Sequence, residues 1–402
     1  MRLNLRSIVP DRVSTPAKYF LFADVLNGFG NGTFGVVIQL YLMTLGFKSS
    51  ALGSMFMMNS IGIVLLTLPA GILADRYGKG KIMIFGFVAI GLALSLTLTV
   101  TRIEMLSLAW LLLGLGNATT TVFGPLYSSL FDREDMDRAF GLRGFINIIC
   151  NSVGSLMGFV PPILVDRSGF SLQSSYWILL AIGTGFLFVQ MPFYLMGSRG
   201  VTEPRGQQGF KFNLRSKVVV AKFSFIYMIS TIGFGVFFSL FPYYVNKMFG
   251  AESDALGSLF FASNFVTAAA QAIAPRISKK LGTLKTIAVT IGLCTPFYFM
   301  IPLAPNFTWL SAAYIIRVFL GSLSDPLVGS FFYKLLYDEE KATANSITRM
   351  VSNGANILAP KLGGQLMEQV SLDAPAFLGA GLYPLIAASY YLLLRNEKEK
   401  GD

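Results

Sequence analysis

The sequence predicts an all-α integral membrane protein with twelve transmembrane helices arranged as two six-helix bundles. Hydrophobic residues make up 53% of the 402 residues and charged residues only 13%, which is about half the charged share of a soluble domain. Twelve apolar runs are long enough to span a bilayer. The two halves of the chain also repeat each other in sequence.

The composition excludes several other classes of protein. The 36 Phe residues are too many for a disordered chain. The two cysteines lie in apolar runs and are too few for a disulfide scaffold. Because the chain has no histidine, zinc sites, haem sites and Ser-His-Asp catalysis lose their usual ligand or base. For the same reason we do not expect an enzyme. The sequence also lacks a Walker A motif, so we do not expect ATP to drive the protein directly, and it lacks a metal-ligand cluster, so we expect no metal or other cofactor.

Each predicted span is a run of about 20 or more mostly apolar residues, and most connections between the runs are short. The longest connection is polar and basic, and it separates an N-terminal bundle (1–197) from a C-terminal bundle (218–402) by a cytoplasmic linker (198–217). The polar first residues and the long first run argue against a cleavable signal peptide. In chain order the spans are residues 17–44, 51–74, 81–100, 104–131, 139–165, 174–197, 218–245, 253–275, 285–303, 307–336, 342–367 and 374–394.

The net charge of +11 indicates how the chain is oriented in the membrane. With both termini in the cytoplasm, most of the 32 Lys and Arg residues fall on the inner side, as the positive-inside rule requires. We therefore interpret the basic balance as a topology signal and not as nucleic-acid binding, and we expect a multi-pass protein of the cell membrane. The basic residues elsewhere are Arg317 and Lys361 inside spans, and Lys48, Arg102, Arg167 and Lys247 in outer loops.

Four segments of the first half recur in the second half, in the same order and about 204 residues later. One short match could arise by chance, whereas four collinear matches indicate an internal repeat. A parallel repeat of six helices is known from secondary transporters, which bind substrate between the repeats near the bilayer midplane. The matching pairs are residues 51–56 and 255–260, 34–36 and 234–236, 125–126 and 326–327, and an R-x3-N-x10-G pattern at 143–158 and 349–364.

The most specific motif lies between the second and third spans. Residues 71–81 read GILADRYGKGK and closely resemble the G-x-L-a-D-r-x-G-r-k loop of the major facilitator superfamily. Through the repeat and the span count, the resemblance extends over the whole chain. It implies a rocker-switch transporter in which Gly71 allows close helix approach and Gly78 forms a tight turn.

The resemblance also implies a gating role for the charged residues of this loop. Asp75 would face a helix N-terminus of the other half, since that end of a helix is favourable for negative charge. Arg76, beside Lys79, would reach an acid such as Asp132 and so latch the outward-facing state from the cytoplasmic side. The alternative is a basic loop that only fixes topology.

Arg143 and Arg349 are matched by the repeat and lie within about two turns of the cytoplasmic ends of their spans. A charge that occurs in both halves points to a scaffold or a gate. We therefore interpret this pair as part of the inner gate, where each arginine would meet an acid.

Other charges occur in only one half, and such charges point to substrate or ions. Charged residues at membrane depth are costly and face a cavity or a partner. Asp24 and Asp325 are candidate proton-coupling residues, because a chain without histidine must relay protons through carboxylates. For Asp24 the alternative is a buried pair with Arg143. Arg317 is a candidate for binding an anionic substrate group or for holding a carboxylate.

Polar uncharged residues inside spans complete the candidate substrate site. Asn27 and Asn31 are four positions apart, and Asn147 and Asn151 repeat that spacing, so each pair forms a stripe on one helix face. Amides at membrane depth bond across helices or line water. Tyr243 belongs to a group of aromatic residues that could line the cavity, although such residues are more often core.

Two further motifs of the same family are displaced in this chain. The R-x-x-x-G spacing expected in the fourth span stands in the tenth, as Arg317-x3-Gly321. The antiporter pattern G-P-x-x-G-G of the fifth span has its closer form at residues 359–364, in the eleventh. These departures leave the direction of transport open.

Together these features predict a secondary active transporter of a small organic solute that works by alternating access. We expect coupling to protons, as a symporter or an antiporter, and a monomer surrounded by membrane lipids. Efflux of amphipathic compounds and uptake of a small organic anion both stay open. A lipid or lysolipid transporter on the same fold is the alternative.

Overall fold

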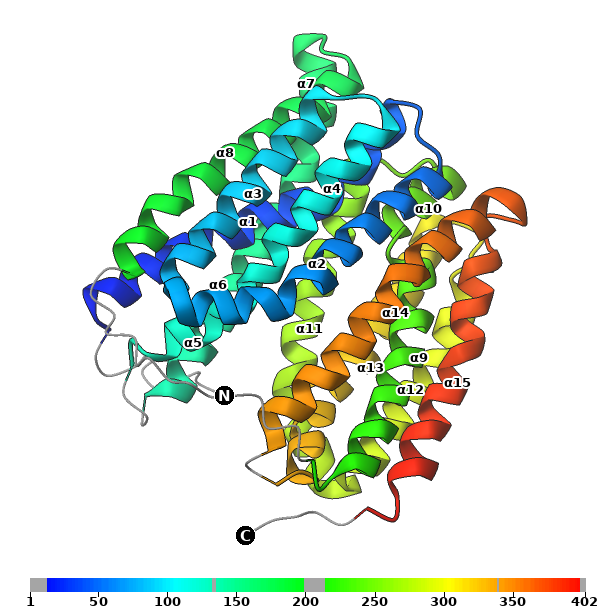
Figure 1. The fold of residues 1–402 in the computed structure, drawn as a ribbon. Coiled ribbons are helices and arrows are strands. Elements are labelled where there is room, and N and C mark those ends of the chain that lie inside the picture. Colours follow the sequence, from blue (N-terminus) through cyan, green and yellow to red (C-terminus); the bar gives the residue numbers. More distant parts are fainter. Residues whose placement is uncertain (1–12, 132–134, 199–213, 338–339, 398–402) are drawn as a thin grey trace, which may run out of the picture. The chain divides into compact units, whose positions relative to one another are not determined.

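The computed structural model describes residues 13–131, 135–198, 214–337 and 340–397, except for the side chains of Asp75, Pro125, Asp137 and Ala342. Within these ranges the regular elements are helices and no strand occurs (Figure 1). Asp132 and most of the predicted linker lie outside the described residues.

The long helices correspond to the predicted spans. In the described residues, eleven helical segments are long and apolar enough to cross a membrane. The N-terminal half has α1 (Thr15–Thr44), α2 (Ser49–Tyr77), α3 (Lys79–Thr99), α4 (Ile103–Ala118) with η2 (Thr119–Val122) and α5 (Phe123–Ser128), α6 (Met136–Ser155) with η3 (Leu156–Phe159) and α7 (Val160–Ser168), and α8 (Leu172–Ser198). The C-terminal half has α9 (Lys217–Phe238) with α10 (Phe241–Phe249), α11 (Ser253–Leu281), α12 (Thr283–Met300), α13 (Phe307–Lys334), α14 (Lys341–Gln369) and α15 (Ala374–Leu394).

The helix α14 is the one predicted span outside those eleven segments. It is 29 residues long, which is enough to cross a bilayer. Its sequence includes Arg349, Lys361, Glu368 and several asparagines, so its hydropathy is lower than that of the other spans. The all-helical fold with two bundles is confirmed.

Local sequence signals set several helix ends. The Ser14 side chain accepts a hydrogen bond from the Ala17 N–H at 3.3 Å, and Asn306 does the same for α13. Gly78, between α2 and α3, has a φ of 101°, and Gly282, between α11 and α12, has a φ of 84°. L side chains rarely adopt this conformation, so the tight turn expected at Gly78 is present and is repeated in the second half.

The helices form two compact units. Unit 1 comprises Met1–Gly46, Met58–Gln207 and Glu252–Phe261, and unit 2 comprises Phe47–Met57, Gln208–Ala251 and Ala262–Asp402. Each unit therefore includes the first turns of a helix whose remainder belongs to the other unit. The domain boundaries expected from the linker, 197 and 218, stay predictions.

The internal repeat is also a repeat of packing. In unit 1, α1 packs against α6 and α8, and α3 packs against α4 and α8. In unit 2, α9 packs against α14 and α15, and α12 packs against α13 and α15, which are the same pairs in the order of the repeat. Even single hydrogen bonds recur: Ser253 donates to the Gly158 carbonyl at 2.7 Å in unit 1, and Ser49 donates to the Gly364 carbonyl at 2.9 Å in unit 2.

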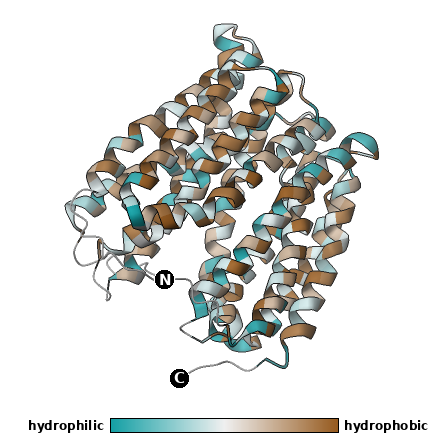
Figure 2. Cartoon of the chain, in the orientation of Figure 1, coloured by the Kyte–Doolittle hydropathy of each residue, from teal (hydrophilic) through white to brown (hydrophobic). Residues whose placement is uncertain are grey.

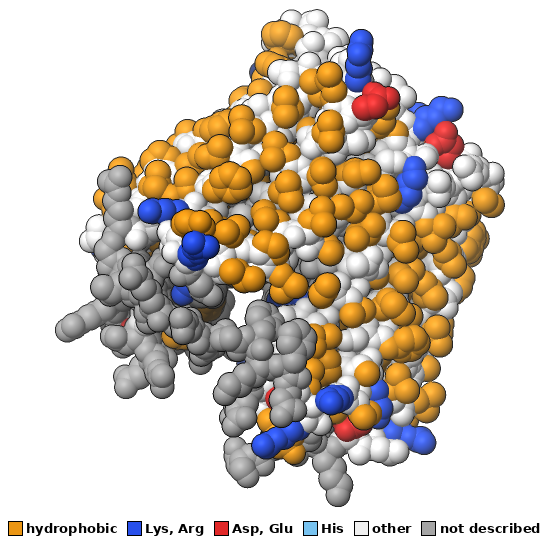
Figure 3. Space-filling model, in the orientation of Figure 1, with side chains coloured by type: hydrophobic (Ala, Val, Ile, Leu, Met, Phe, Trp, Pro, Cys, Tyr) orange, Lys and Arg blue, Asp and Glu red, His pale blue; other side chains and the backbone are white. Residues whose placement is uncertain are grey.

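The outer surface of the helices suits a lipid environment. Figures 2 and 3 show hydrophobic residues along the visible helices, with most of the charged residues near helix ends. Large apolar side chains are exposed at mid-helix, including Leu108 at 65% and Phe265 at 72%. A water-soluble protein would rarely expose so much contiguous apolar surface, and the chain is therefore a multi-pass membrane protein.

Candidate substrate and ion sites

Unit 2 contains the larger cavity, about 620 Å³ in volume, among α9, α11, α12, α13 and α15. This volume lies within the range of small-molecule sites. The charged residues among its described lining are Arg317 and Asp325, both on α13. The structure thus brings together two of the residues that the sequence selected. Four tyrosines also line the cavity: Tyr227, Tyr314, Tyr383 and Tyr390.

Arg317 is buried, with 8% of its surface exposed, and it is surrounded by aromatic rings. Its guanidinium carbon lies 4.3 Å from the ring centre of Phe238 and 5.3 Å from those of Phe234 and Tyr383, within the range of cation–π attraction. One terminal nitrogen donates a hydrogen bond to the Tyr383 hydroxyl, whereas Nε has no partner among the described residues. No carboxylate of the described residues lies within 4 Å of the guanidinium, so its charge has no counterion within the described part of the chain.

Asp325 lines the same cavity and is exposed. Among the described residues its carboxylate makes no hydrogen bond and no ion pair within 4 Å. The helix continues through Pro326, which directly follows it. The cavity therefore presents one cation and one anion that are not bound to each other.

Asp24 has a different environment, in unit 1. Its carboxylate is 1% exposed, and it accepts hydrogen bonds from Arg143 Nε at 2.8 Å and from the Tyr194 hydroxyl at 3.0 Å. The Arg143 guanidinium lies 3.8 Å from the ring centre of Phe123. The structure therefore has the buried pair that the sequence offered as the alternative to a proton site. It also reveals Tyr194 as a third member, which no sequence pattern had indicated.

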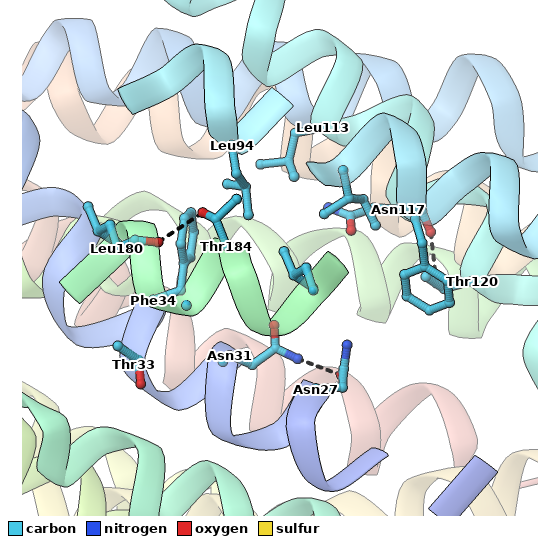
Figure 4. A pocket seen from close by; sticks show the side chains of 15 residues that line it. Asn27, Asn31, Thr33, Phe34, Leu94, Leu113, Asn117, Thr120, Leu180 and Thr184 are labelled. Carbon is cyan, nitrogen blue, oxygen red and sulfur yellow. Dashed lines mark hydrogen bonds between the residues drawn. The ribbon is translucent and has the colours of Figure 1, made fainter. Parts of the chain in front are cut away.

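Unit 1 contains a smaller pocket of about 200 Å³, formed by α1, α3, α4 and α8 (Figure 4). Asn27 and Asn31 both line it, and the Asn31 amide donates to the Asn27 side-chain oxygen at 2.8 Å. Asn117, Thr120 and Thr184 add further polar groups. None of the described lining residues is charged.

The two cavities occupy corresponding positions of the internal repeat. Leu113 of unit 1 and Arg317 of unit 2 are about 204 positions apart, and so are Ile90 and Cys294 of the same two linings. Each cavity is thus built from the first, third, fourth and sixth span of its own half, with α11 added in unit 2. Of the two described linings, that of unit 2 contains charged residues and that of unit 1 does not.

The structure places Asn147 and Asn151 in neither cavity. Both lie on α6, where their backbone carbonyls face Gly28 and Gly32 of α1. A Cβ added at Gly28 would lie 3.0 Å from the Asn147 oxygen, and one at Gly32 would collide with the Asn151 oxygen. The α6 backbone at these positions therefore packs closely on α1, and a substrate contact by the two side chains stays a prediction.

Tyr243 is also absent from the described linings. It lies on α10 with 7% of its surface exposed, whereas the tyrosines that line the cavity in unit 2 come from α9, α13 and α15. Tyr383, the hydrogen-bond partner of Arg317, is the most informative residue that the sequence did not single out.

The structure describes only part of the 71–81 loop motif. Asp132 and the side chain of Asp75 lie outside the described residues. Arg76 is exposed and lies over the Tyr77 ring, with 5.5 Å between the guanidinium carbon and the ring centre. A Cβ added at Gly71 would meet no atom within 4 Å, so the close helix approach expected there is not seen.

The two repeat-matched arginines differ in their partners. Arg143 meets an acid, as expected. Arg349 is exposed and donates to the Asn345 side chain at 3.3 Å, and no acid of the described residues lies within 4 Å of it. The acid expected for Arg349 stays a prediction; the position that corresponds to Asp24 in the repeat is a hydroxyl, Ser224.

Two helical bundles with apolar surfaces, each enclosing a cavity of ligand size, define a multi-pass membrane protein of the transporter class. A family model described as Major Facilitator Superfamily matches residues 20–223 and again residues 223–402. The chain therefore belongs to the Major Facilitator Superfamily, and it is a transporter and not an enzyme.

Similar proteins agree with this assignment. The chain is 22% identical over 327 residues to Multidrug resistance protein 1 of Bacillus subtilis, covering 80% of this chain and 82% of that protein. It is 23% identical over 276 residues to the Staphyloferrin A transporter of Staphylococcus aureus, covering 66% and 68%. An auto-inhibited POT family peptide transporter superposes with a TM-score of 0.78 at 12% identity, covering 97% and 99% of the two chains. The nucleoside transporter NupG superposes with 0.71 at 16%, covering 96% and 100%. The two structures support the fold alone.

Proposed function

We propose that the chain is a proton-coupled secondary active transporter of a small organic anion, working by rocker-switch alternating access. The observation that carries the proposal is Arg317, a buried guanidinium on the wall of a ligand-sized cavity without a carboxylate partner among the described residues. A buried charge is stable only with a counterion or hydrogen-bond acceptors. A substrate anion supplies both.

The surroundings of Arg317 also favour a particular kind of anion. Aromatic rings cover the guanidinium, so its free N–H groups point along its edge. Carboxylate and phosphate groups accept two parallel hydrogen bonds from such an edge. The aromatic lining of the cavity suits an apolar or aromatic body attached to the acidic group.

Asp325 supports proton coupling through the charge balance of the cavity. Arg317 and Asp325 are the charged residues of its described lining, so together they carry no net charge when both are ionised. An anion bound at Arg317 adds a negative charge in a region of low dielectric, and proton uptake by Asp325 removes it. Symport of one proton for each negative charge of the substrate follows from this balance.

Asp24 is the second candidate for proton coupling, and its geometry supports that role less strongly. Its carboxylate is already held by Arg143 and Tyr194. A coupling role for Asp24 requires the pair to open during the transport cycle. We further propose that the 71–79 loop and Arg143 form the inner gate, and that both termini lie on the cytoplasmic side of the cell membrane.

Transport by proteoliposomes tests the proposal. Purified protein would be reconstituted and supplied with a panel of labelled carboxylates and phosphate esters, with benzoate as the simplest aromatic acid. We expect an inward proton gradient to accelerate uptake of at least one anion. Arg317→Gln should weaken the apparent affinity for that anion by about tenfold or more, because a charge-assisted hydrogen bond is lost. Asp325→Asn should retain anion exchange and lose the acceleration.

The control is Arg167→Gln, because Arg167 is exposed on α7. This variant should transport like the unmodified protein. Unchanged affinity in Arg317→Gln, or a panel in which no anion is carried, would contradict the proposal.

Efflux of amphipathic cations is a second candidate function. The observation in its favour is the exposed carboxylate of Asp325 beside tyrosine-rich walls, and a relative at 22% identity is named for multidrug resistance. The same variants separate the two functions. Cation efflux would be lost in Asp325→Asn and retained in Arg317→Gln, the reverse of the pattern expected for anion affinity.

A further inference from the structure

The small pocket of unit 1 differs in chemistry from the cavity with Arg317. Its polar groups are the amides of Asn27, Asn31 and Asn117 and the hydroxyls of three threonines. Figure 4 shows Asn27 and Asn31 on α1 and Asn117 on α4, with apolar side chains such as Leu94 and Leu113 between the helices. The pocket thus combines apolar walls with a few convergent neutral hydrogen-bonding groups, the usual make-up of a small-molecule site.

The hydrogen-bonding capacity of these amides is only partly used. One bond joins Asn31 to Asn27, although each amide has two donor hydrogens and an acceptor oxygen. The side chain of Asn117 makes no hydrogen bond within the part of the chain that the structure describes. Gln190, fully buried one turn beyond the pocket residue Leu187 on α8, has neither amide atom bonded to a described residue. Unused amide groups inside a membrane bundle favour a ligand that can satisfy them.

The pocket disfavours charged ligands. None of the lining residues that the structure describes carries a charge at neutral pH. The position that holds Arg317 in unit 2 holds Leu113 here. An ion would lose its hydration and find only amides and hydroxyls, which cannot neutralise it. The size of the pocket sets a second limit. A cavity of roughly 150 Å³ holds benzene, so about 200 Å³ suits a single substituted ring.

We propose that the unit 1 pocket is a separate binding site for small uncharged molecules that carry an amide, urea or hydroxyl group on an aromatic or compact apolar body. The amide or hydroxyl group bonds Asn27, Asn31 and Asn117, and the ring lies against Phe34 and the leucines. This site does not depend on Arg317 or Asp325, so it stands or falls apart from the proposed anion transport.

Trp110 offers a direct reporter of this pocket. Its ring centre lies 6.4 Å from that of Phe34, a lining residue. The chain has three tryptophans, so replacing Trp177 and Trp309 by Phe leaves Trp110 as the single emitter. The probe is 4-bromobenzamide, whose bromine quenches tryptophan fluorescence at short range. We expect saturable quenching that excess benzamide reverses, and quenching by the charged isostere 4-bromobenzoate at least tenfold weaker.

Glycines on α8 provide matched variants. Gly183 lines the pocket, and Gly185 does not; a Cβ added at either position meets no atom within 4 Å. Gly183→Leu fills the pocket without a clash at Cβ and should weaken 4-bromobenzamide quenching by about tenfold or more. Gly185→Leu should leave quenching unchanged, and so should Arg317→Gln.

Two results would overturn the assignment. Equal quenching by the benzoate would show that the pocket does not select neutral molecules. Unaltered quenching in a Gly183→Leu protein that elutes as a single species would show that the probe binds elsewhere. Should Gly183→Leu not yield folded protein, Asn117→Leu in the same single-tryptophan background serves in its place, with the same expected loss.

Discussion

Removing the guanidinium of Arg143 should destabilise the protein much more than removing the carboxylate of Asp24. The two charges form one ion pair at 2.8 Å, but they differ in exposure: the Asp24 side chain is 1% exposed and that of Arg143 is 31% exposed. In Arg143→Gln the carboxylate stays buried with only the Tyr194 hydroxyl as a strong partner. Leaving a buried charge without its partner costs about 3–5 kcal/mol.

Asp24→Asn leaves a charge that can be stabilised in other ways. The Arg143 guanidinium reaches solvent and retains its position 3.8 Å from the ring centre of Phe123, a cation–π contact worth about 0.5–2 kcal/mol. The new amide can still accept from Tyr194. We therefore expect a loss of only about 1–2 kcal/mol, the value of a typical intramolecular hydrogen bond or slightly more.

Apparent melting temperature in detergent measures the difference. For a unit of this size, about 1 kcal/mol corresponds to roughly 2–4 °C, so Arg143→Gln should lower the midpoint by roughly 6–20 °C and Asp24→Asn by roughly 2–8 °C. The double variant removes both charges and should recover most of the loss of Arg143→Gln. Equal losses in the two single variants, or no recovery in the double variant, would refute the buried-pair reasoning.

The single variant Asp24→Asn, which keeps Arg143 of the proposed gate, also separates structure from coupling. If Asp24 only stabilises the bundle, Asp24→Asn, once reconstituted, should respond to a proton gradient like the unmodified protein. If it transports without a response to the gradient, Asp24 carries the proton, and the role proposed for Asp325 is wrong.

Three further outcomes follow from the geometry. Gly32→Ala should destabilise the protein by about 1–3 kcal/mol because the added Cβ collides with an α6 carbonyl. Gly35→Ala should be neutral or slightly stabilising, because a Cβ there meets no atom within 4 Å. Melting temperatures of the two variants test this difference. Gln190→Met should raise the melting temperature, since it replaces a buried amide that lacks a partner among the described residues. A lower melting temperature would show that the amide makes hydrogen bonds in the folded protein. Tyr383→Phe removes the side-chain acceptor that Arg317 has among the described residues. It should change the affinity for anions without changing that for neutral molecules, and transport competition measures both.

The spans and their pairing were accessible from the sequence for clear physical reasons. A bilayer requires about 20 apolar residues per helix, and this requirement fixes twelve spans within a few residues. The repeat of residues 51–56 at 255–260 predicts that the two halves pack alike, and α1 with α8 corresponds to α9 with α15. The positions of Arg317 and Asp325 on one cavity wall agree with their shared span.

The rotation of each helix about its own axis could not be predicted from the sequence. A span that is apolar on all sides has little hydrophobic asymmetry, so periodicity does not tell which face meets a neighbour. For this reason the sequence selected Tyr243, which lies outside the described linings, and did not select Tyr383, which bonds Arg317. The partner of Asp24 stayed open for the same reason, since only packing brings α6 and α8 to this carboxylate.

The two cavities differ in chemistry although the two halves share one fold. Both halves have a cavity between corresponding helices, but the charged residues at membrane depth have different surroundings in each half. In unit 1 the Asp24 carboxylate is bound within the scaffold and the pocket is neutral. In unit 2 the equivalent of Asp24 is a serine, and Arg317 and Asp325 on the cavity wall form no ion pair with a described residue. Charges bound to each other stabilise a bundle, whereas unpaired charges can exchange partners with substrate and protons. This difference between the halves, and not the shared fold, underlies our proposals that unit 2 carries charge and that unit 1 binds neutral molecules.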